Sequence, residues 1–342
     1  RNFRRYFWLL LYLFGAAPAV CKSFVRNREH DLVPVGNDSH SLHKPFATSL
    51  RMGNLGYQSD AQGSLVVCYN DIAQYTRTLK GALETPYKPY EHLGLKDSQG
   101  NYQQLTTNLL QIENEFYSPI RPKRTAASGE TPLEALQSSG VEYIEVRCVD
   151  LNPLAACGID RETIRFLDTF LLFCLLKESP KTNNKEYQQI TENQRRTVAD
   201  GRNPDLELVD GDEQRKLVDW GLDLVAEMQP VAALLDKAHR GDDYQATLAR
   251  MGERLQNNSL TPAAMLLDEM QENNETYYRM AMRKAVEHRE YFRSQKLAPE
   301  VIEKYQQLAA QSQLEQQQIE ASETLSFDDF LAAYYHCDNL VT

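Results

Sequence analysis

The 342-residue sequence lacks the residue spacings that mark several common kinds of site. Its six cysteines form no CxxC pair, which excludes a zinc ribbon and the dense disulfide framework of a small secreted domain. Its seven histidines include no HExxH motif, and neither a P-loop nor a GxGxxG stretch occurs. Any nucleotide site would therefore have to be built on something other than a glycine-rich loop.

The chain also lacks an excess of positive charge, since its formal net charge is −11. This argues against general binding to nucleic acid or to an anionic membrane surface, because both need clustered Lys and Arg. We interpret the cysteines as mostly buried thiols in a reducing compartment, and we expect a cytoplasmic protein. The close pair His40 and His43 is interpreted as part of a surface loop rather than a metal site.

The N-terminal segment has no apolar run long enough to span a bilayer, because the run from Phe7 to Phe14 is short. Its basic start and the following "APA" are typical of a signal peptide, after which a mature chain would begin near Val20. The competing interpretation is an internal buried helix that ends at Gly15. The absence of an initiator Met favours this second interpretation.

With 42% hydrophobic and 25% charged residues, the composition is that of a globular protein that can form a sizeable core. Residues 48–153 alternate strand-like runs with turn signals, and we expect strands within 63–71, 108–124 and 141–149. The expected helices of this part are an amphipathic one over 72–83, which stops before Pro86, and a short one from Thr131 with Pro132 in its first turn.

Almost everything after Asp160 has helical patterns, and "RETIRFLDTFLLFCLLKES" is apolar enough to be a buried helix. Apolar stripes fall at helical spacing in two places, at Leu217, Trp220, Leu224 and Met228 and at Tyr244, Leu248, Met251 and Leu255. Helix starts are predicted at Pro262 and Pro299, the second leading into a Gln-rich solvated helix. We predict an α+β fold, with a sheet domain over 1–160 and a mainly helical region over 161–342.

The stretch "VEYIEVRCVDLNP" places charged residues on one face of a predicted strand. Side chains alternate along a strand, so Tyr143, Glu145 and Arg147 share one face while Ile144, Val146 and Cys148 share the other, apolar face. In "LQIENEFYSPIRPKR", Glu113, Glu115 and Tyr117 share a face in the same way, ahead of the cluster Arg121 to Arg124. Pairing of the two strands would collect carboxylates, tyrosines and arginines on one sheet face.

Two interpretations of this face remain open. It could be a solvent-exposed sheet surface with cross-strand ion pairs, an arrangement in which the charges carry little free-energy penalty because they are not buried. Alternatively, carboxylates could hold Mg²⁺ while arginines contact phosphate oxygens, the combination that phosphoryl transfer requires.

Four segments in the same order, "YLFGAAPAVCKSF", "FATSLRMGNLGY", "LLQIENEFYSPIRPKR" and "VEYIEVRCVDLNP", resemble the proteobacterial type of the glutamate–cysteine ligase family. The resemblance extends over residues 1–170 and is looser beyond Asn184. It implies a partial antiparallel sheet of the glutamine synthetase type. It also implies ATP-dependent ligation of L-glutamate, through a γ-acyl phosphate, to L-cysteine, which is the first step of glutathione synthesis.

Residue by residue, the resemblance implies that Glu145 is a Mg²⁺ ligand and that Arg147 contacts the transferring phosphate. Arg51, Tyr57 and Tyr117 match positions that line the cysteine site. Family members also carry an N-terminal acidic cluster that holds most of the metal, and this chain begins after it. We therefore expect a fragment that is inactive alone. The alternatives are a related carboxylate–amine ligase and a non-catalytic helical interaction protein that retains a ligase-like sheet.

Overall fold

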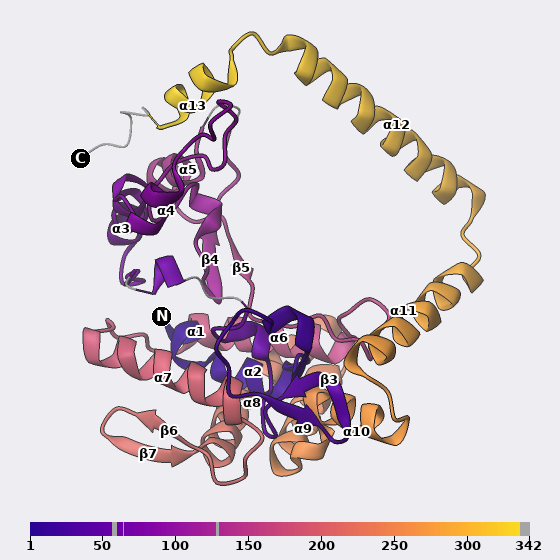
Figure 1. Cartoon of the computed structure of the whole chain (residues 1–342). Coiled ribbons are helices and arrows are strands. Elements are labelled where there is room, and N and C mark those ends of the chain that lie inside the picture. The colour runs from indigo at the N-terminus through magenta and orange to yellow at the C-terminus, as the bar shows by residue number, and fades with distance from the viewer. Residues whose placement is uncertain (57–59, 64, 128–129, 336–342) are drawn as a thin grey trace.

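The computed structural model describes residues 1–56, 60–63, 65–127 and 130–335, and its elements form a mainly helical part below and a smaller mixed part above in Figure 1. The helices are α1 Asn2–Tyr6, α2 Trp8–Phe14, α3 Ile72–Glu84, α4 Lys88–Leu93, α5 Pro132–Ser139, α6 Arg161–Leu176, α7 Asn184–Asp200, α8 Leu217–His239, α9 Asp243–Gln256, α10 Pro262–Glu272, α11 Tyr277–Ser294, α12 Pro299–Ser322 and α13 Phe327–Tyr335. The strands are β1 Ala19–Cys21, β2 Val33–Val35, β3 Asp38–His43, β4 Ile120–Lys123, β5 Tyr143–Val146, β6 Glu207–Asp210 and β7 Glu213–Lys216.

The strands form three small antiparallel sheets in the described residues. One has the order β1-β3-β2, and the others are the pairs β4-β5 and β6-β7. His40 and His43 lie on β3, so the prediction that they belong to a loop was wrong. The β6-β7 hairpin was not predicted either, because its strands are polar. The sequence feature that indicates this hairpin is Gly211, whose positive φ of 64° suits the turn between the two strands.

The largest core combines the first fourteen residues with the helices after residue 160. Trp8 and Tyr12 of α2 are buried in the same cluster as Phe166 and Phe170 of α6 and the apolar faces of α8 and α9. The interpretation of Phe7 to Phe14 as a buried helix is therefore confirmed. Because this core draws residues from both sides of position 160, it does not establish two separate domains, and the proposed division stays a prediction.

The buried helix α2 is followed by Gly15, a position where only glycine fits. A β-carbon at Gly15 would lie 2.5 Å from the carbonyl oxygen of Leu11 and 2.8 Å from the backbone of Thr48. No real side chain is tolerated that close to backbone atoms, so the glycine allows the chain to turn directly from α2 toward β1.

The predicted helices after Asp160 are confirmed where the apolar spacing was regular. Both predicted stripes, one on α8 and one on α9, are buried. Helices α10 and α12 begin at Pro262 and Pro299 as expected, and the Gln-rich α12 has no buried residue. Among the shorter elements, α3 and α5 also lie where they were predicted, and Thr131 forms a complete capping box with Glu134.

Two expected strands are shorter or absent. Residues 65–71 contain no strand in the described part of that segment, and within 108–124 the strand is confined to β4. Glu113–Glu115 instead form a short 3₁₀ helix, in which the Glu115 carboxylate accepts a hydrogen bond from the Gln111 N–H at 2.6 Å. This local side-chain contact offers the backbone an alternative to a strand ladder.

The cysteines were expected to be mostly buried, and this was wrong. The five described cysteines are free thiols, and Cys148 alone among them is buried. Cys157 is exposed, and the other three are half-buried. Cys337 lies outside the described residues.

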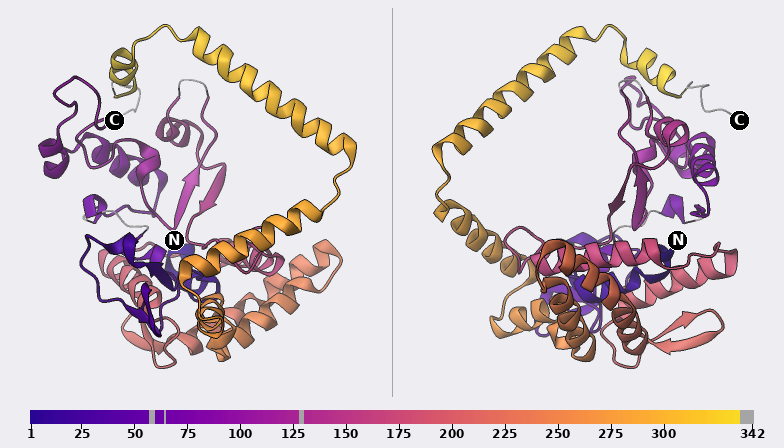
Figure 2. Two further views of the ribbon diagram at one scale, coloured as in Figure 1. Left: turned by 45° about the vertical axis from the view of Figure 1, so that its right-hand side comes forward. Right: turned by 180° about the vertical axis from the view of Figure 1, so that it is seen from behind.

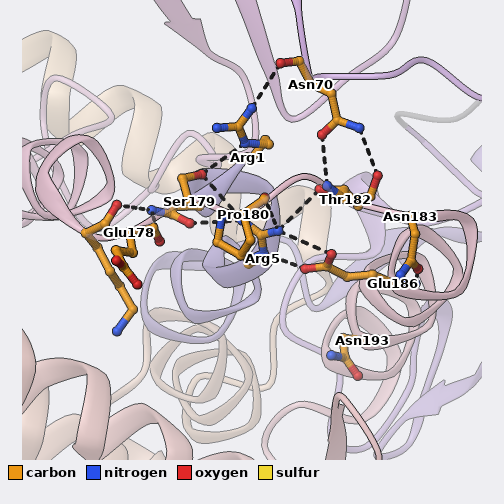
Figure 3. Close-up of polar contacts among 12 residues, drawn as sticks. Arg1, Arg5, Asn70, Glu178, Ser179, Pro180, Thr182, Asn183, Glu186 and Asn193 are labelled. Carbon is orange, nitrogen blue, oxygen red and sulfur yellow. Dashed lines mark hydrogen bonds and ion pairs between the residues drawn. The ribbon is translucent and has the colours of Figure 1, made fainter.

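A polar network joins the two parts of the structure at the start of α1 (Figure 3). The side-chain amide of Asn70 donates to the Thr182 carbonyl and accepts from the Thr182 N–H, both at 2.8 Å. Arg1 donates to the Asn70 carbonyl at 2.9 Å, while Arg5 pairs with the Glu186 carboxylate. The segment that leads into the upper part is thus tied to the helical part at its base.

Helices α11, α12 and α13 form an arch that leaves the lower part and returns to the upper part (Figures 1 and 2). At its far end the Tyr335 hydroxyl donates to the Gln111 carbonyl at 2.6 Å, and Tyr334 donates to the Glu113 carboxylate. The ring of Phe327 packs against Tyr102 with 5.1 Å between centroids. No helix in the described ranges has the length and apolar character needed to cross a membrane.

Candidate functional site

The candidate site is built on the antiparallel pair β4-β5, which confirms the predicted pairing of these segments. The register sets Arg121 of β4 directly opposite Glu145 of β5. The apolar face of β5 was predicted less well. Val146 packs against the main core and Cys148 is buried, but Ile144 is 44% exposed.

Glu145 lies between two arginines. Its Oε2 accepts hydrogen bonds from Arg121 Nε at 2.9 Å and Nη2 at 2.8 Å, and its Oε1 is 3.8 Å from Arg147 Nε. Arg121 is buried, and it also donates to the Asn114 carbonyl at 2.9 Å. The tight pair is therefore Arg121 with Glu145, whereas Arg147 lies farther from this carboxylate.

Opposing effects act on the pKa of Glu145. Partial burial raises it, but the hydrogen bond from Arg121 and the charges of Arg121, Arg147 and Lys123 together lower it below its usual range. Glu145 is therefore a carboxylate at neutral pH. The local field is positive, because three cations surround one anion.

Arg51 lies on the short 3₁₀ helix Leu50–Met52 and is fixed by the segment that follows β5. Its Nε donates to Asp150 Oδ1 at 2.6 Å, and its Nη2 donates to the carbonyls of Arg147 and Val149 at 3.1 and 3.0 Å. Asp150 is buried, and its other oxygen accepts from the Ala16 N–H at 2.8 Å. The structure therefore places Arg51 next to the backbone of Arg147.

Tyr117 precedes β4 and is 42% exposed. It lines a cavity of about 320 Å³ together with Met52 and Asn54, which lie within three residues of Arg51 in the chain, and with residues of α7. Its N–H donates to the Gln62 side chain at 2.9 Å. The predicted site residue Tyr57 lies outside the described residues.

The described residues do not by themselves form a metal centre. No cluster of three or more His, Cys, Asp or Glu side chains suited to a metal occurs in the described ranges. Mg²⁺ prefers six oxygen ligands and commonly takes one or two from carboxylates and others from water and phosphate. Glu145 fits as one such ligand through Oε1, since Oε2 is occupied by Arg121. The surrounding arginines would oppose a cation unless phosphate accompanied it.

The sequence did not predict two contacts of this site, that of Arg121 with Glu145 and that of Asp150 with Arg51. Arg121 was counted in a basic cluster at a strand end, and its pairing with Glu145 became visible only with the strand register. Asp150 follows β5, and its contact with Arg51 was not predicted. The only sequence signal for Asp150 was a carboxylate at the end of an apolar strand.

Comparison with known proteins adds the following findings. The family model described as glutamate–cysteine ligase matches residues 1–197. A glutamate–cysteine ligase from Alcanivorax borkumensis is 47% identical over 340 residues, and one from Pseudomonas putida W619 is 47% identical over 334. The matches cover 98% of this chain but 64% and 63% of those proteins, so the chain spans less than two thirds of their length.

Solved structures give a consistent result. The crystal structure of a glutamate–cysteine ligase from Francisella tularensis in complex with AMP superposes with a TM-score of 0.89 at 33% identity, covering 98% of this chain and 65% of that one. A bifunctional glutathione synthetase from Pasteurella multocida has a TM-score of 0.57 at 20% identity, covering 85% of this chain and 32% of that one, which indicates a shared fold alone.

Proposed function

Because the chain belongs to the glutamate–cysteine ligase family, we propose that it forms part of an enzyme that joins the γ-carboxylate of L-glutamate to the amine of L-cysteine at the expense of ATP. The product is γ-glutamylcysteine, and the reaction is the first step of glutathione synthesis. The observation that carries this proposal is the row formed by Arg121 of β4, Glu145 of β5 and Arg147, which directly follows β5.

In this proposal Arg147 contacts the transferring phosphoryl group. A guanidinium is a planar, permanently charged donor that matches phosphate oxygens. Arg147 Nε lies 3.8 Å from Glu145 Oε1, and the Arg147 side chain is 23% exposed, so a ligand in solution can reach its guanidinium. Arg121, by contrast, is committed to Glu145 and acts as a positioning residue that sets the orientation of the carboxylate.

Glu145 would hold Mg²⁺ through one oxygen. The bound ion would supply positive charge to the phosphate oxygens. The depressed pKa of Glu145 supports this role, because a ligand carboxylate must be ionised. Since Glu145 is the one carboxylate of the row, we expect this chain alone to bind metal weakly and to turn over slowly or not at all.

Arg51, Tyr57 and Tyr117 would bind cysteine. The guanidinium of Arg51 is oriented by Asp150 and its side chain is 35% exposed, which suits contact with an amino-acid carboxylate. The aromatic ring of Tyr117 forms part of the wall of the cavity of about 320 Å³ that Met52 also lines. Tyr57 is included on the family resemblance alone.

We further propose that β4 and β5 belong to a larger antiparallel sheet of the glutamine synthetase type in complete family members. Tyr143 and Ile144 on β5 are 48% and 44% exposed, and this supports the proposal that further parts of a complete family member pack against this strand. We propose a cytoplasmic location with ATP, L-glutamate and L-cysteine as ligands.

The test combines a binding assay with a turnover assay. Binding of a fluorescent ATP analogue in the presence of Mg²⁺ is measured for the 342-residue chain and for Arg147→Ala, Glu145→Gln and the control Arg195→Ala, whose side chain is 68% exposed. Formation of γ-glutamylcysteine is followed by mass spectrometry in a full-length family protein that carries the same substitutions, with cysteine replaced by other amines in parallel.

We expect Arg147→Ala to weaken nucleotide binding about tenfold and to lower turnover about a hundredfold or more, since it removes a transition-state contact. Arg195→Ala should change neither. Unchanged binding and turnover in both site variants would favour a non-catalytic protein with a ligase-like sheet. Comparable turnover with another amine would instead favour a related carboxylate–amine ligase.

A further inference from the structure

A second cavity, distinct from the β4-β5 site, is lined by cations. Its volume is about 910 Å³, and its walls come from the 3₁₀ helix Lys22–Val25 and the turn after it, from β3, and from the first turn of α11. The charged and imidazole side chains that line it are Lys22, Arg26, Arg28, His30, His40 and Arg279. No Asp or Glu is among the described lining residues, although the chain as a whole carries a net charge of −11.

The walls of this cavity are held in place by specific contacts. The Tyr277 N–H donates to Ser41 Oγ at 2.8 Å, which fixes the start of α11 against β3. Arg28 donates to the Leu55 carbonyl at 3.0 Å, and its guanidinium lies 5.8 Å from the centre of the Phe24 ring. The cations therefore project from an ordered frame rather than from a free tail.

Asp38 is near the cavity in the sequence, and its Oδ1 accepts a hydrogen bond from the His40 N–H at 2.7 Å. The other neighbouring carboxylates are directed elsewhere. Asp31 pairs with Lys44 at 2.6 Å, and both Asp31 and Glu29 line a different cavity. Glu275, which precedes α11, pairs with Arg283 at 2.7 Å. Within the described residues, no carboxylate lies within ion-pair distance of the cavity's lysine or of its three arginines.

Several cations that surround one hollow without an acidic partner repel one another, and this repulsion is relieved by a bound anion. The arginine fork matches phosphate geometry, and the volume lies in the range of small-molecule sites. We propose that this cavity binds a small ligand that carries two or more phosphate groups.

This site is separate from the proposed ligase site and does not depend on it. Figure 1 shows β3 and the start of α11 close together in the lower part, whereas β4 and β5 rise above them. None of Glu145, Arg147 or Tyr117 lines the cationic cavity, and none of its cations lines the cavity beside Tyr117. Ligand binding here can therefore be measured without any turnover.

The experiment is isothermal titration of the 342-residue chain with sodium tripolyphosphate in EDTA, which removes Mg²⁺ and so disfavours binding at the proposed ligase site. The test variant is Arg26→Ala/Arg279→Ala. The matched control is Arg77→Ala/Arg293→Ala, which removes the same charge from exposed positions on α3 and on the far end of α11. Circular dichroism verifies that all proteins are folded alike.

We expect one tripolyphosphate to bind per chain. Its affinity should fall about tenfold or more in the test variant, because charge-assisted contacts are lost, and should change little in the control variant. Binding should also weaken as salt is raised. ATP, AMP and citrate are titrated in parallel. Tighter binding of ATP than of tripolyphosphate would identify a nucleotide as the source of the phosphates, whereas citrate binding without tripolyphosphate binding would overturn the proposal.

Three further results would also overturn it. These are no measurable binding, equal weakening in the test and control variants, and loss of binding on Arg147→Ala, which would assign the phosphate to the ligase site instead.

Discussion

Replacing Arg121 by Met tests whether the strand pair depends on the contact between Arg121 and Glu145. The substitution keeps an unbranched side chain of similar reach but removes the guanidinium. Glu145 then loses two hydrogen bonds, of 2.9 and 2.8 Å, and the Asn114 carbonyl loses one of 2.9 Å. Arg147, at 3.8 Å, is too distant to replace them without moving.

The expected cost follows from the number and exposure of these contacts. A hydrogen bond to a charged group contributes about 1.5–3 kcal/mol when well buried. Since the Glu145 side chain is 38% exposed, water compensates for part of the loss. We expect the free energy of unfolding to fall by about 2–3 kcal/mol in Arg121→Met. Lys123→Met, two residues along the same strand, should cost less than about 0.5 kcal/mol.

The loss should depend on pH. Because the pKa of Glu145 is lowered in the folded protein, its pairing stabilises the native state above the usual carboxyl pKa of about 4.3 and is lost as pH falls through the folded-state pKa. The stability difference between wild type and Arg121→Met should therefore be largest near pH 7 and shrink below pH 4.

The assay is urea unfolding of wild type, Arg121→Met, Glu145→Gln and the double variant, followed by circular dichroism and by tryptophan fluorescence so that a single transition can be verified. The double-mutant cycle should give a coupling energy of about 1–2 kcal/mol. A coupling below about 0.3 kcal/mol, or a loss that does not change with pH, would refute the assigned contact.

Three other outcomes are expected. Asp150→Asn should weaken binding of cysteine while leaving ATP binding unchanged, because it removes the charge that orients Arg51, and titration of a full-length family protein with each ligand checks this. Leu248→Ala should lower the free energy of unfolding by about 2–5 kcal/mol in urea titrations, since the side chain is fully buried. Burial raises the pKa of Cys148 to about 12, so at pH 8 iodoacetamide should modify the exposed Cys157 and spare Cys148 until the protein is unfolded, as peptide mass spectrometry can show.

The sequence predicted the elements whose signals are local. The α8 stripe from Leu217 to Met228 and the cap at Thr131 depend on spacing within one helix, and both were correct. The segment from Glu113 to Tyr117 was predicted wrongly because alternation alone suggested a strand. Its Glu and Asn residues favour strands weakly, and contacts between nearby side chains and backbone turn it into a 3₁₀ helix.

The candidate site was predictable in part. Arg147 and Glu145 could be singled out because they alternate with Ile144, Val146 and Cys148 in the sequence. Their contacts could not, because a shift of one residue in register would place Arg121 opposite Ile144 or Val146 instead of Glu145. The contact of Asp150 with Arg51 joins segments 99 residues apart, and no short-range pattern encodes such a distance.

The exposed helix α12 sets the distance and the rotation between two anchored ends. Its 24 residues give a rod of about 36 Å, and its ends lead to α11 in one part and to α13 in the other. Insertion of one residue would lengthen the rod by about 1.5 Å and turn α13 by about 100°, so that Tyr334 and Tyr335 would face away from Glu113 and Gln111. The arch therefore tolerates substitutions along the exposed surface of α12 far better than insertions or deletions that change the length of the helix.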